Sequence, residues 1–380
     1  MNENGIISTP MSQPDITEGD IDLVAQVLRS GRLSIGAYIE EFEKRVRDYV
    51  GTRYAVAVAS GTAGLHLCMR LAGVKEGAEV VTSPFSFVAS ANCILYEHGT
   101  PVFVDIDEDS FNIDADAIDA AVNDRTVAIL PVHVFGRPAR MDQICRTADR
   151  RGLLVIEDAC EAIGAELDGR KVGTFGRASV FAFYPNKQMT TGEGGIVTTD
   201  DPRWDRELRA LRNHGRAGDE WLQHHQLGFN YRLNELSAAL GLSQISRLDD
   251  LLDRRAAVAA TYNERLARIA AVKPLSVAAN TTRMSWFVYI VRLDARLSRD
   301  NIASRLAKRG IPTRNYFPPI HLQPYFVERY GYQRGQFPVT ERVAASTLAL
   351  PFHTNMPEQA VDHVCRALQM AIDEESRRSA

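Results

Sequence analysis

Cysteine is scarce in this chain. The sequence has 380 residues and five cysteines, which are odd in number, scattered and free of C-x-x-C spacing. They are Cys68, Cys93, Cys145, Cys160 and Cys365. This set does not form a disulfide framework, so we expect reduced thiols, mostly small core hydrophobes, in a cytoplasmic enzyme. We predict no metal site.

Three further patterns are missing from the sequence. The net charge of -4 leaves no basic excess, so nucleic acid is not the expected partner. No apolar run approaches the ~18 residues that span a bilayer, and the start lacks a signal-peptide pattern, so we expect no membrane partner. Neither G-x-G-x-x-G nor G-x-x-x-x-G-K-S/T occurs, which leaves a nicotinamide or ATP site without support.

A regular alternation of apolar strands and helix-like segments is present between residues 54 and 197. Helices are predicted over residues 61–71, 115–122 and 141–151, and a continuous apolar strand over 79–82 is typical of the strands. Continuous apolar strands indicate a sheet that is covered on both faces. The predicted fold class is therefore α/β, with a mostly parallel central sheet and helices on both faces.

The pattern changes near residue 245. Residues 238–266 predict one or two long helices, and residues 286–293 alternate as a strand. We expect a smaller C-terminal α+β domain after a large α/β domain. The predicted division is 1–245 and 246–380.

Lys187 is the most informative residue of the chain. It stands in the stretch 181–195, in which an apolar strand leads into a Pro-Asn turn, one lysine and a glycine-rich loop. Most loop lysines are solvated surface charges. Here the flanking segments indicate buried strands, and a lysine that core elements hold in a crevice can act as an amine nucleophile. A Schiff base with pyridoxal phosphate (PLP) requires such an amine.

Two other motifs stand where strands end. The turn 60–64, Ser-Gly-Thr-Ala-Gly, opens a helix, and its backbone N–H groups could bind an anion or could simply be capped by Ser60. Asp158 and Glu161 follow an apolar strand, where ligands of parallel α/β sheets lie. An acid there can pair with a protonated pyridine nitrogen, or it can cap a helix.

The remaining candidates are ambiguous from residue type alone. Phe87 opens a helix and could stack on an aromatic ring, although core packing is the commoner role. The segments 213–216 and 228–234 are polar and aromatic loops. The segment 314–325 is rich in proline and aromatics, as the wall of a polar ligand site could be, and its His321 is more often structural than catalytic.

Taken together, these motifs resemble the DegT/DnrJ/StrS family, the PLP-dependent sugar aminotransferases of aspartate aminotransferase fold type I. The resemblance covers nearly the whole chain, with several spaced motifs in order. These are residues 28–36, 60–65, 157–165, 181–195, 228–238 and 316–325.

The resemblance implies roles for single residues. Lys187 matches the Schiff-base lysine, Asp158 the partner of the pyridine nitrogen, and Phe87 the aromatic over the cofactor face. The turn that binds the phosphate matches Gly61, Thr62 and Ala63. The resemblance also assigns three residues to the substrate, namely Ser34, Tyr316 and His321.

Asn230 matches an asparagine that reaches the phosphate of the neighbouring subunit's cofactor, which implies a homodimer with shared active sites. Two positions depart from the family pattern. Glu161 stands where many relatives have Gln near the cofactor's phenolic oxygen, and Ala182 stands where many have a Ser on the phosphate. The first departure could change how the cofactor is tuned, and the second suggests that other donors hold the phosphate.

The implied activity moves an amino group from L-glutamate, the expected donor, to a nucleotide-linked keto sugar for surface polysaccharide or related glycan biosynthesis. The loop 190–195 is similar to that of members acting at C4 of 4-keto-6-deoxy sugars. Three alternatives stay open: an aminotransferase acting at C3, a PLP-dependent sugar dehydratase, and a non-catalytic regulator or sensor. Dehydratase relatives carry His in place of the lysine, so Lys187 argues against the second.

Overall fold

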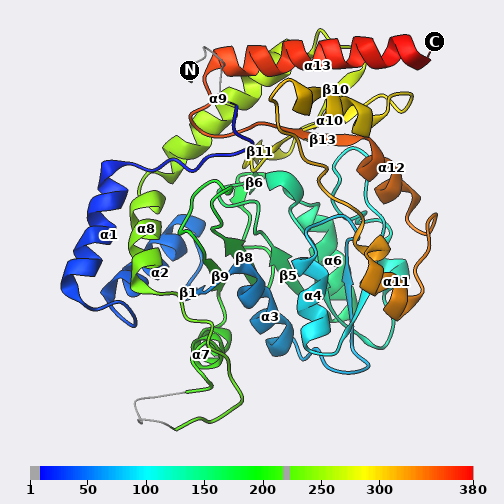
Figure 1. Cartoon of the computed structure of the whole chain (residues 1–380). Helices are drawn as coiled ribbons and strands as arrows, with labels where there is room; N and C mark the ends of the chain where they lie inside the picture. Colours follow the sequence, from blue (N-terminus) through cyan, green and yellow to red (C-terminus); the bar gives the residue numbers. More distant parts are fainter. Residues whose placement is uncertain (1–8, 217–222, 380) are drawn as a thin grey trace.

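The computed structural model describes residues 9–216 and 223–379, and Figure 1 shows the path of the chain. The α-helices are α1 Glu18–Ser30, α2 Ala37–Val50, α3 Gly61–Leu71, α4 Ala89–Tyr96, α5 Ile118–Ala121, α6 Met141–Arg151, α7 Pro202–Leu211, α8 Glu235–Ile245, α9 Leu248–Leu266, α10 Arg299–Lys308, α11 Pro324–Tyr330, α12 Pro338–Ser346 and α13 Glu358–Ser379. Short 3-10 turns are η1 Val134–Gly136 and η2 Ile320–Leu322. Over the described ranges, no helix has the length and apolar content that crossing a membrane requires.

A seven-stranded sheet forms the centre of the molecule, in the order β1-β9-β8-β5-β4-β2-β3. The strands of the whole chain are β1 Tyr54–Val58, β2 Glu79–Thr82, β3 Thr100–Phe103, β4 Thr126–Leu130, β5 Leu154–Asp158, β6 Glu166–Leu167, β7 Arg170–Lys171, β8 Ala178–Ala182, β9 Gly195–Thr199, β10 Val272–Pro274, β11 Thr281–Arg283, β12 Tyr289–Leu293 and β13 Thr347–Leu350. Pairing is parallel from β3 through β2, β4 and β5 to β8. Only the pairings of β9 with β8 and β1 are antiparallel in this sheet. The predicted α/β class with a mostly parallel sheet is confirmed.

Helices cover both faces of this sheet, because successive strand residues point to opposite sides. One face packs against α3, α4 and α7 through Val56, Val80, Ile156, Val180 and Val197. The other face packs against α2, α6 and α8 through Ala57, Val81, Ile129, Val155 and Phe181. Because helices bury both faces of the sheet, the strands are continuous apolar runs in the sequence.

Most helices begin and end near the predicted residues. α3 and α6 match the predicted ranges, and the long helical region after residue 235 divides into α8 and α9 at Ser246 and Arg247. The helix predicted over 115–122 is wrong in length, because α5 covers only Ile118–Ala121. The Asp114 carboxylate accepts the Asp116 amide at 3.1 Å, and this local turn competes with the first helical turn.

The C-terminal part of the chain builds a second layer above the sheet (Figure 1). Strands β10, β12 and β13 form an antiparallel sheet that α9, α10 and α13 pack against. A third small sheet joins the two parts, because β11 pairs with β6 of the preceding part. One apolar cluster likewise includes Phe85 and Phe135 together with Tyr262 and Tyr289. The division at 245/246 lies between α8 and α9 and stays a prediction.

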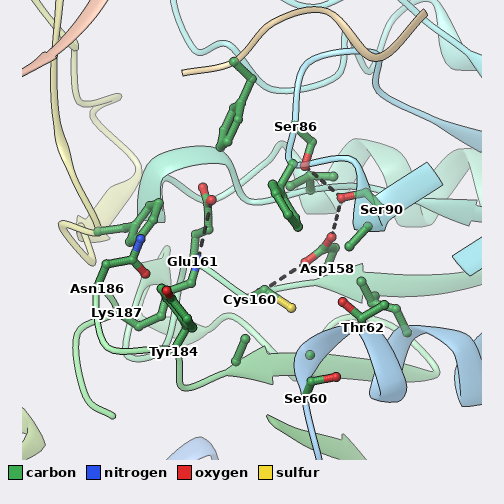
Figure 2. A pocket seen from close by; sticks show the side chains of 18 of the residues that line it. Ser60, Thr62, Ser86, Ser90, Asp158, Cys160, Glu161, Tyr184, Asn186 and Lys187 are labelled. Carbon is green, nitrogen blue, oxygen red and sulfur yellow. Dashed lines mark hydrogen bonds and ion pairs between the residues drawn. The ribbon is translucent and has the colours of Figure 1, made fainter. Parts of the chain in front are cut away.

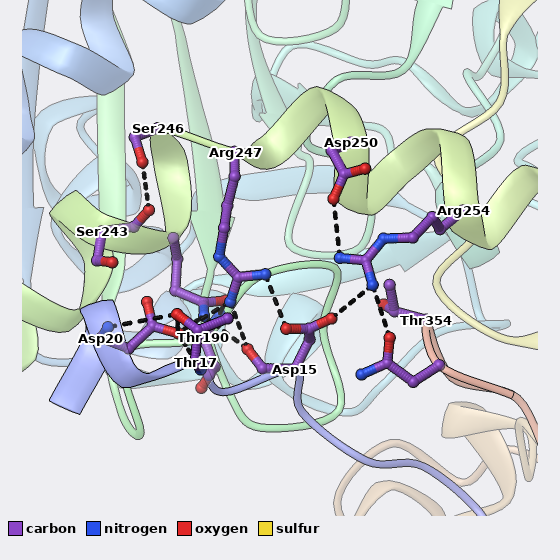
Figure 3. A network of polar contacts seen from close by, with 12 residues as sticks. Asp15, Thr17, Asp20, Thr190, Ser243, Ser246, Arg247, Asp250, Arg254 and Thr354 are labelled. Carbon is purple, nitrogen blue, oxygen red and sulfur yellow. Dashed lines mark hydrogen bonds and ion pairs between the residues drawn. The ribbon is translucent and has the colours of Figure 1, made fainter.

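A polar network ties the N-terminal segment to the junction of α8 and α9 (Figure 3). Arg247 binds the Asp15 carboxylate at 2.8 Å and the Asp20 carboxylate at 2.9 Å. The Gln244 amide donates to the Asp15 carbonyl and to Asp20, and its oxygen accepts the Thr190 amide at 3.4 Å. The network therefore extends from the start of α1 to the loop that follows Lys187.

Candidate active site

A cavity of about 420 Å³ opens at the carboxyl ends of the central strands (Figure 2). Its wall consists of Ser60, Gly61, Thr62, Leu65, Ser86, Phe87, Ala89, Ser90, Val132, Asp158, Cys160, Glu161, Ala182, Tyr184, Asn186, Lys187, Glu193, Gly194, Phe287, Tyr316 and Phe317. Most of these residues lie at or directly after the ends of β1, β2, β4, β5 and β8, where ligands of open α/β sheets bind. The C-terminal part closes the cavity with Phe287, Tyr316 and Phe317.

Lys187 extends into this cavity with its side chain 13% exposed. Its Nζ lies 3.6 Å from the Glu161 Oε1 atom and 3.8 Å from the centre of the Phe287 ring. A carboxylate and an aromatic face both attract a cation. The lysine is therefore held between two groups inside the protein, and the prediction that core elements carry it into a crevice is confirmed.

Glu161 is buried beside Lys187. Its Oε2 atom accepts the Phe135 amide at 2.8 Å, which fixes the carboxyl group. Burial raises the pKa of Glu161, and the nearby Lys187 ammonium opposes this rise. The site thus contains a carboxyl whose proton affinity depends on the charge of the lysine.

Asp158 ends β5, and its carboxylate is buried at the floor of the cavity. The Ser90 hydroxyl donates to Oδ2 at 2.6 Å, and the Cys160 amide donates to Oδ1 at 3.2 Å. Ser86 and Ser90 share a second hydrogen bond of 2.8 Å (Figure 2). Both carboxyl oxygens of Asp158 thus have a donor, and these hydrogen bonds fix the orientation of the carboxyl group in the cavity.

The turn before α3 approaches the end of β8 closely. Ser60 caps α3, because its hydroxyl oxygen accepts the Ala63 amide at 3.1 Å. A Cβ atom on Gly61 would lie 2.7 Å from the Ala182 Cβ and 2.8 Å from the Cys160 sulfur. No side chain fits there, and the first residues of this helix N-terminus, Gly61 and Thr62, line the cavity.

Aromatic and amide side chains line the remainder of the wall. Phe87 is 60% exposed and Tyr184 is 52% exposed, so both present rings to the cavity and to solvent. Burial raises the pKa of Tyr316, and the Glu161 carboxylate adds to the rise. Asn186 stands beside Lys187 (Figure 2) with a buried Oδ1 atom that has no hydrogen-bond partner among the described residues.

Four predicted site residues lie outside this cavity, and one of them, Ala63, is buried in α3 with its amide bonded to the Ser60 hydroxyl. Ser34 is exposed before α2, and Asn230 is exposed beyond the cavity, in a bridge with Asn213. His321 is fully buried, with its Nε2 atom 3.2 Å from Glu341. The substrate contact predicted for His321 is not supported, because packing leaves its ring no access to the cavity.

The segment around Asn230 is anchored to α3 by a buried histidine. His66 Nδ1 lies 3.0 Å from the Tyr231 hydroxyl, and His66 Nε2 lies 2.9 Å from Glu97. Tyr231 stacks on Phe229 with ring centres 5.0 Å apart. The two neighbours of Asn230 are thus packed on α3, while Asn230 itself faces outward.

Sequence reasoning missed Ser90, Asn186 and Phe287. Ser90 carried a weak signal, since it is a small polar residue in the first turn of the largely apolar α4. Phe287 carried none, because it stands in a segment that alternates as a strand.

The wall fits PLP on three observations of this structure. The open helix N-terminus at Gly61 can receive a phosphate, the Asp158 carboxylate can face a pyridinium nitrogen, and the Lys187 amine can reach an aldehyde. The cavity volume also lies within the ~300–1,000 Å³ usual for small-ligand sites.

Comparison with known proteins gives a consistent result. The model of the DegT/DnrJ/EryC1/StrS aminotransferase family matches residues 14–369. GDP-perosamine synthase of Caulobacter vibrioides is 38% identical over 341 residues, which cover 89% of this chain and 91% of that protein. Helicobacter pylori PseC, an aminotransferase involved in the biosynthesis of pseudoaminic acid, has a TM-score of 0.92 at 28% identity, covering 97% of this chain and 100% of that chain.

A third relative bears on the cofactor. Spr1654 of Streptococcus pneumoniae, solved in its PLP form, has a TM-score of 0.92 at 27% identity and covers 97% of this chain and 99% of that chain. The same protein was also solved in its PMP form. These matches span both parts of the fold and the whole wall of the cavity. The chain therefore belongs to the DegT/DnrJ/EryC1/StrS family, as a PLP-dependent sugar aminotransferase.

Proposed function

We propose that this enzyme transfers the amino group of L-glutamate to C4 of a nucleotide-linked 4-keto-6-deoxy sugar. The observation that carries the proposal is the Lys187 amine, held in a cavity opposite a hydrogen-bonded Asp158 carboxylate. The loop 190–195 supports C4, since it is similar to that of members acting there. The name of the Caulobacter relative supports a nucleotide-linked sugar.

Each group of the cavity has a proposed task. When bound, PLP supplies an aldehyde that condenses with amines and a protonated ring that accepts electron density from a substrate carbon. Lys187 holds the cofactor covalently and, once released, moves a proton at the reacting carbon. Asp158 pairs with the protonated ring nitrogen, and Ser90 and the Cys160 amide hold the Asp158 carboxyl group in place.

The phosphate is assigned to the turn Gly61–Ala63, and the cofactor face to Phe87. Ala182 offers no hydroxyl for the phosphate. The N–H groups of Gly61 and Thr62 are the donors that this chain presents instead, since the Ala63 amide is bonded to Ser60. Glu161 is assigned to the phenolic side of the ring because it lies beside Lys187.

We further propose a homodimer in which Asn230 serves the partner's site. Asn230 is exposed and does not line the cavity of its own chain, although Phe229 and Tyr231 are firmly packed. A side chain presented outward from a rigid segment suits a contact with a second copy.

The test combines Lys187→Ala with a matched surface variant, Lys273→Ala. Lys273 is exposed, is paired with Asp109 at 3.0 Å and does not line the cavity. We expect Lys187→Ala to fold, to lose the visible band that borohydride removes from the wild type, and to lose turnover. Lys273→Ala should keep both. Substantial transamination by Lys187→Ala would refute the assignment.

The substrate is tested by glutamate-dependent assays of 4-keto and 3-keto nucleotide sugars, read by mass spectrometry. Amination of the 4-keto sugars supports the proposal, and amination of the 3-keto sugars alone refutes its regiochemistry. A sugar that loses water without gaining nitrogen would identify a dehydratase. A colourless protein that cannot be loaded with PLP would identify a non-catalytic relative.

A further inference from the structure

The groups that surround the Lys187 amine come from three separate segments. Lys187 belongs to the loop after β8, Glu161 to the loop after β5, and Phe287 to the segment before β12. The distances of 3.6 Å to Glu161 and 3.8 Å to Phe287 depend on how these segments sit together. A residue that fixes all three segments would fix the environment of the amine.

Gln188 joins these three segments. It follows Lys187 directly, and it is 3% exposed. Its side-chain Nε2 donates to the Glu161 carbonyl at 2.6 Å, the Ser285 carbonyl at 3.1 Å and the Ser285 hydroxyl at 2.8 Å. One amide group therefore connects the lysine loop to the backbone of Glu161 and to the segment that carries Phe287.

The segment 285–287 is also held from its other sides. Arg255, 2% exposed, donates to the Trp286 carbonyl at 2.6 Å and to the Phe287 carbonyl at 2.7 Å. The Ser285 amide donates to the Gly136 carbonyl, and a Cβ on Gly136 would lie 1.4 Å from the Ser285 oxygen. All three carbonyls of the segment thus have buried donors, and Phe287 has little freedom to move.

We propose that Gln188 is a positioning residue, which holds the Lys187 amine between Glu161 and Phe287. The proposal rests on the proposed role of Lys187 in binding the cofactor. Gln188 has no contact with the cavity itself, since it does not line the wall. Without its amide, the Glu161 and Ser285 carbonyls lose a donor, and the loop that carries Lys187 can move away from Phe287, which Arg255 still holds.

The first test uses the apo protein and does not depend on any substrate. The chain has six lysines, and reductive methylation with ¹³C-formaldehyde labels each of them for NMR. The Lys187 signal, assigned by its loss in Lys187→Arg, should be shifted by the Phe287 ring. We expect Gln188→Leu to move this signal toward those of the exposed lysines.

The second test measures turnover of the PLP-loaded enzyme. A misplacement of about 1 Å near reacting groups can cost on the order of 100-fold in rate, so Gln188→Leu should lower kcat by about 10- to 100-fold. KM for both substrates should change far less, because the cavity wall keeps its residues. Gln244→Leu is the matched control, since Gln244 is 1% exposed and its Nε2 bonds Asp15 and Asp20, while its contact with the Thr190 amide is a long 3.4 Å.

The control variant Gln244→Leu should keep the wild-type NMR signal of Lys187, even if the substitution lowers the stability of the protein. If Gln188→Leu does not fold, Ser285→Ala replaces it, because this change removes one acceptor of Gln188 at 2.8 Å and leaves the carbonyl. An unchanged Lys187 signal in the folded variant overturns the proposal. A shifted signal in a protein without transaminase activity would uphold the positioning role and refute the proposed function.

Discussion

Gly61→Ala tests whether the close approach of α3 to β8 builds the phosphate site. The new Cβ would lie 2.7 Å from the Ala182 Cβ and 2.8 Å from the Cys160 sulfur. Ala182 belongs to a central strand, so its Cβ moves only if the backbone moves. The strain must therefore shift the first turn of α3.

The magnitude follows from these two contacts. Adding a methyl group to a packed site costs about 1–3 kcal/mol, so the free energy of unfolding should fall by that amount. A displaced helix N-terminus also loses a backbone N–H bond to the phosphate. Such a bond to a charged group contributes about 1.5–3 kcal/mol, which corresponds to roughly 10- to 150-fold in the PLP dissociation constant.

The assay titrates apo protein with PLP, followed by visible absorbance, beside urea unfolding of the apo protein. Gly19→Ala serves as the control, because a Cβ at this position in α1 meets only the Thr17 hydroxyl oxygen at 3.7 Å. It should leave PLP affinity unchanged and stability equal or slightly higher. Wild-type PLP affinity in Gly61→Ala would refute the reasoning.

Three further predictions concern pH and the polar networks. Burial raises the pKa of the Glu161 carboxyl above 4.5. The stability that the protonated carboxyl contributes to the fold is therefore fully present below about pH 4.5, and it is lost as pH rises through the raised pKa. The thermal unfolding midpoint of the apo protein should therefore fall over this pH range in the wild type and should not fall there in Glu161→Gln. Because burial lowers the pKa of His66 below 6.5, its contribution is present above about pH 6.5 and is lost as pH falls. In the same assay, the thermal midpoint of His66→Gln should fall less toward low pH than that of the wild type. Arg247→Met leaves the buried Asp20 carboxylate without its cation, so urea unfolding should show a loss of about 3 kcal/mol.

The sequence predicted those elements whose signal is local. Residues 61–71 and 141–151 form helices as expected, because a cap or a terminal glycine coincides with apolar periodicity. Lys187 and Asp158 also meet in one cavity, as the rule for strand ends requires. Helices α1 and α2 were not predicted, since their packing against α8 is a long-range effect.

Segments whose conformation depends on residues distant in the chain could not be predicted from the sequence. The alternation over residues 286–293 predicts a strand, yet β12 begins at Tyr289. Residues before it are bound by Arg255 and Gln188, which lie about 30 and 100 positions earlier in the chain. His321 was placed in the substrate site by motif alone, whereas packing against Phe337 buries it.

The closure of the cavity by Phe287, Tyr316 and Phe317 has a consequence for biosynthesis. A ribosome adds about 5–20 residues per second, so roughly 10 s separate the appearance of Lys187 from that of Phe317. During that interval the nascent chain carries the lysine without the wall that shields it. The site is therefore assembled near the end of synthesis, and productive capture of the cofactor is a late event in the life of the chain.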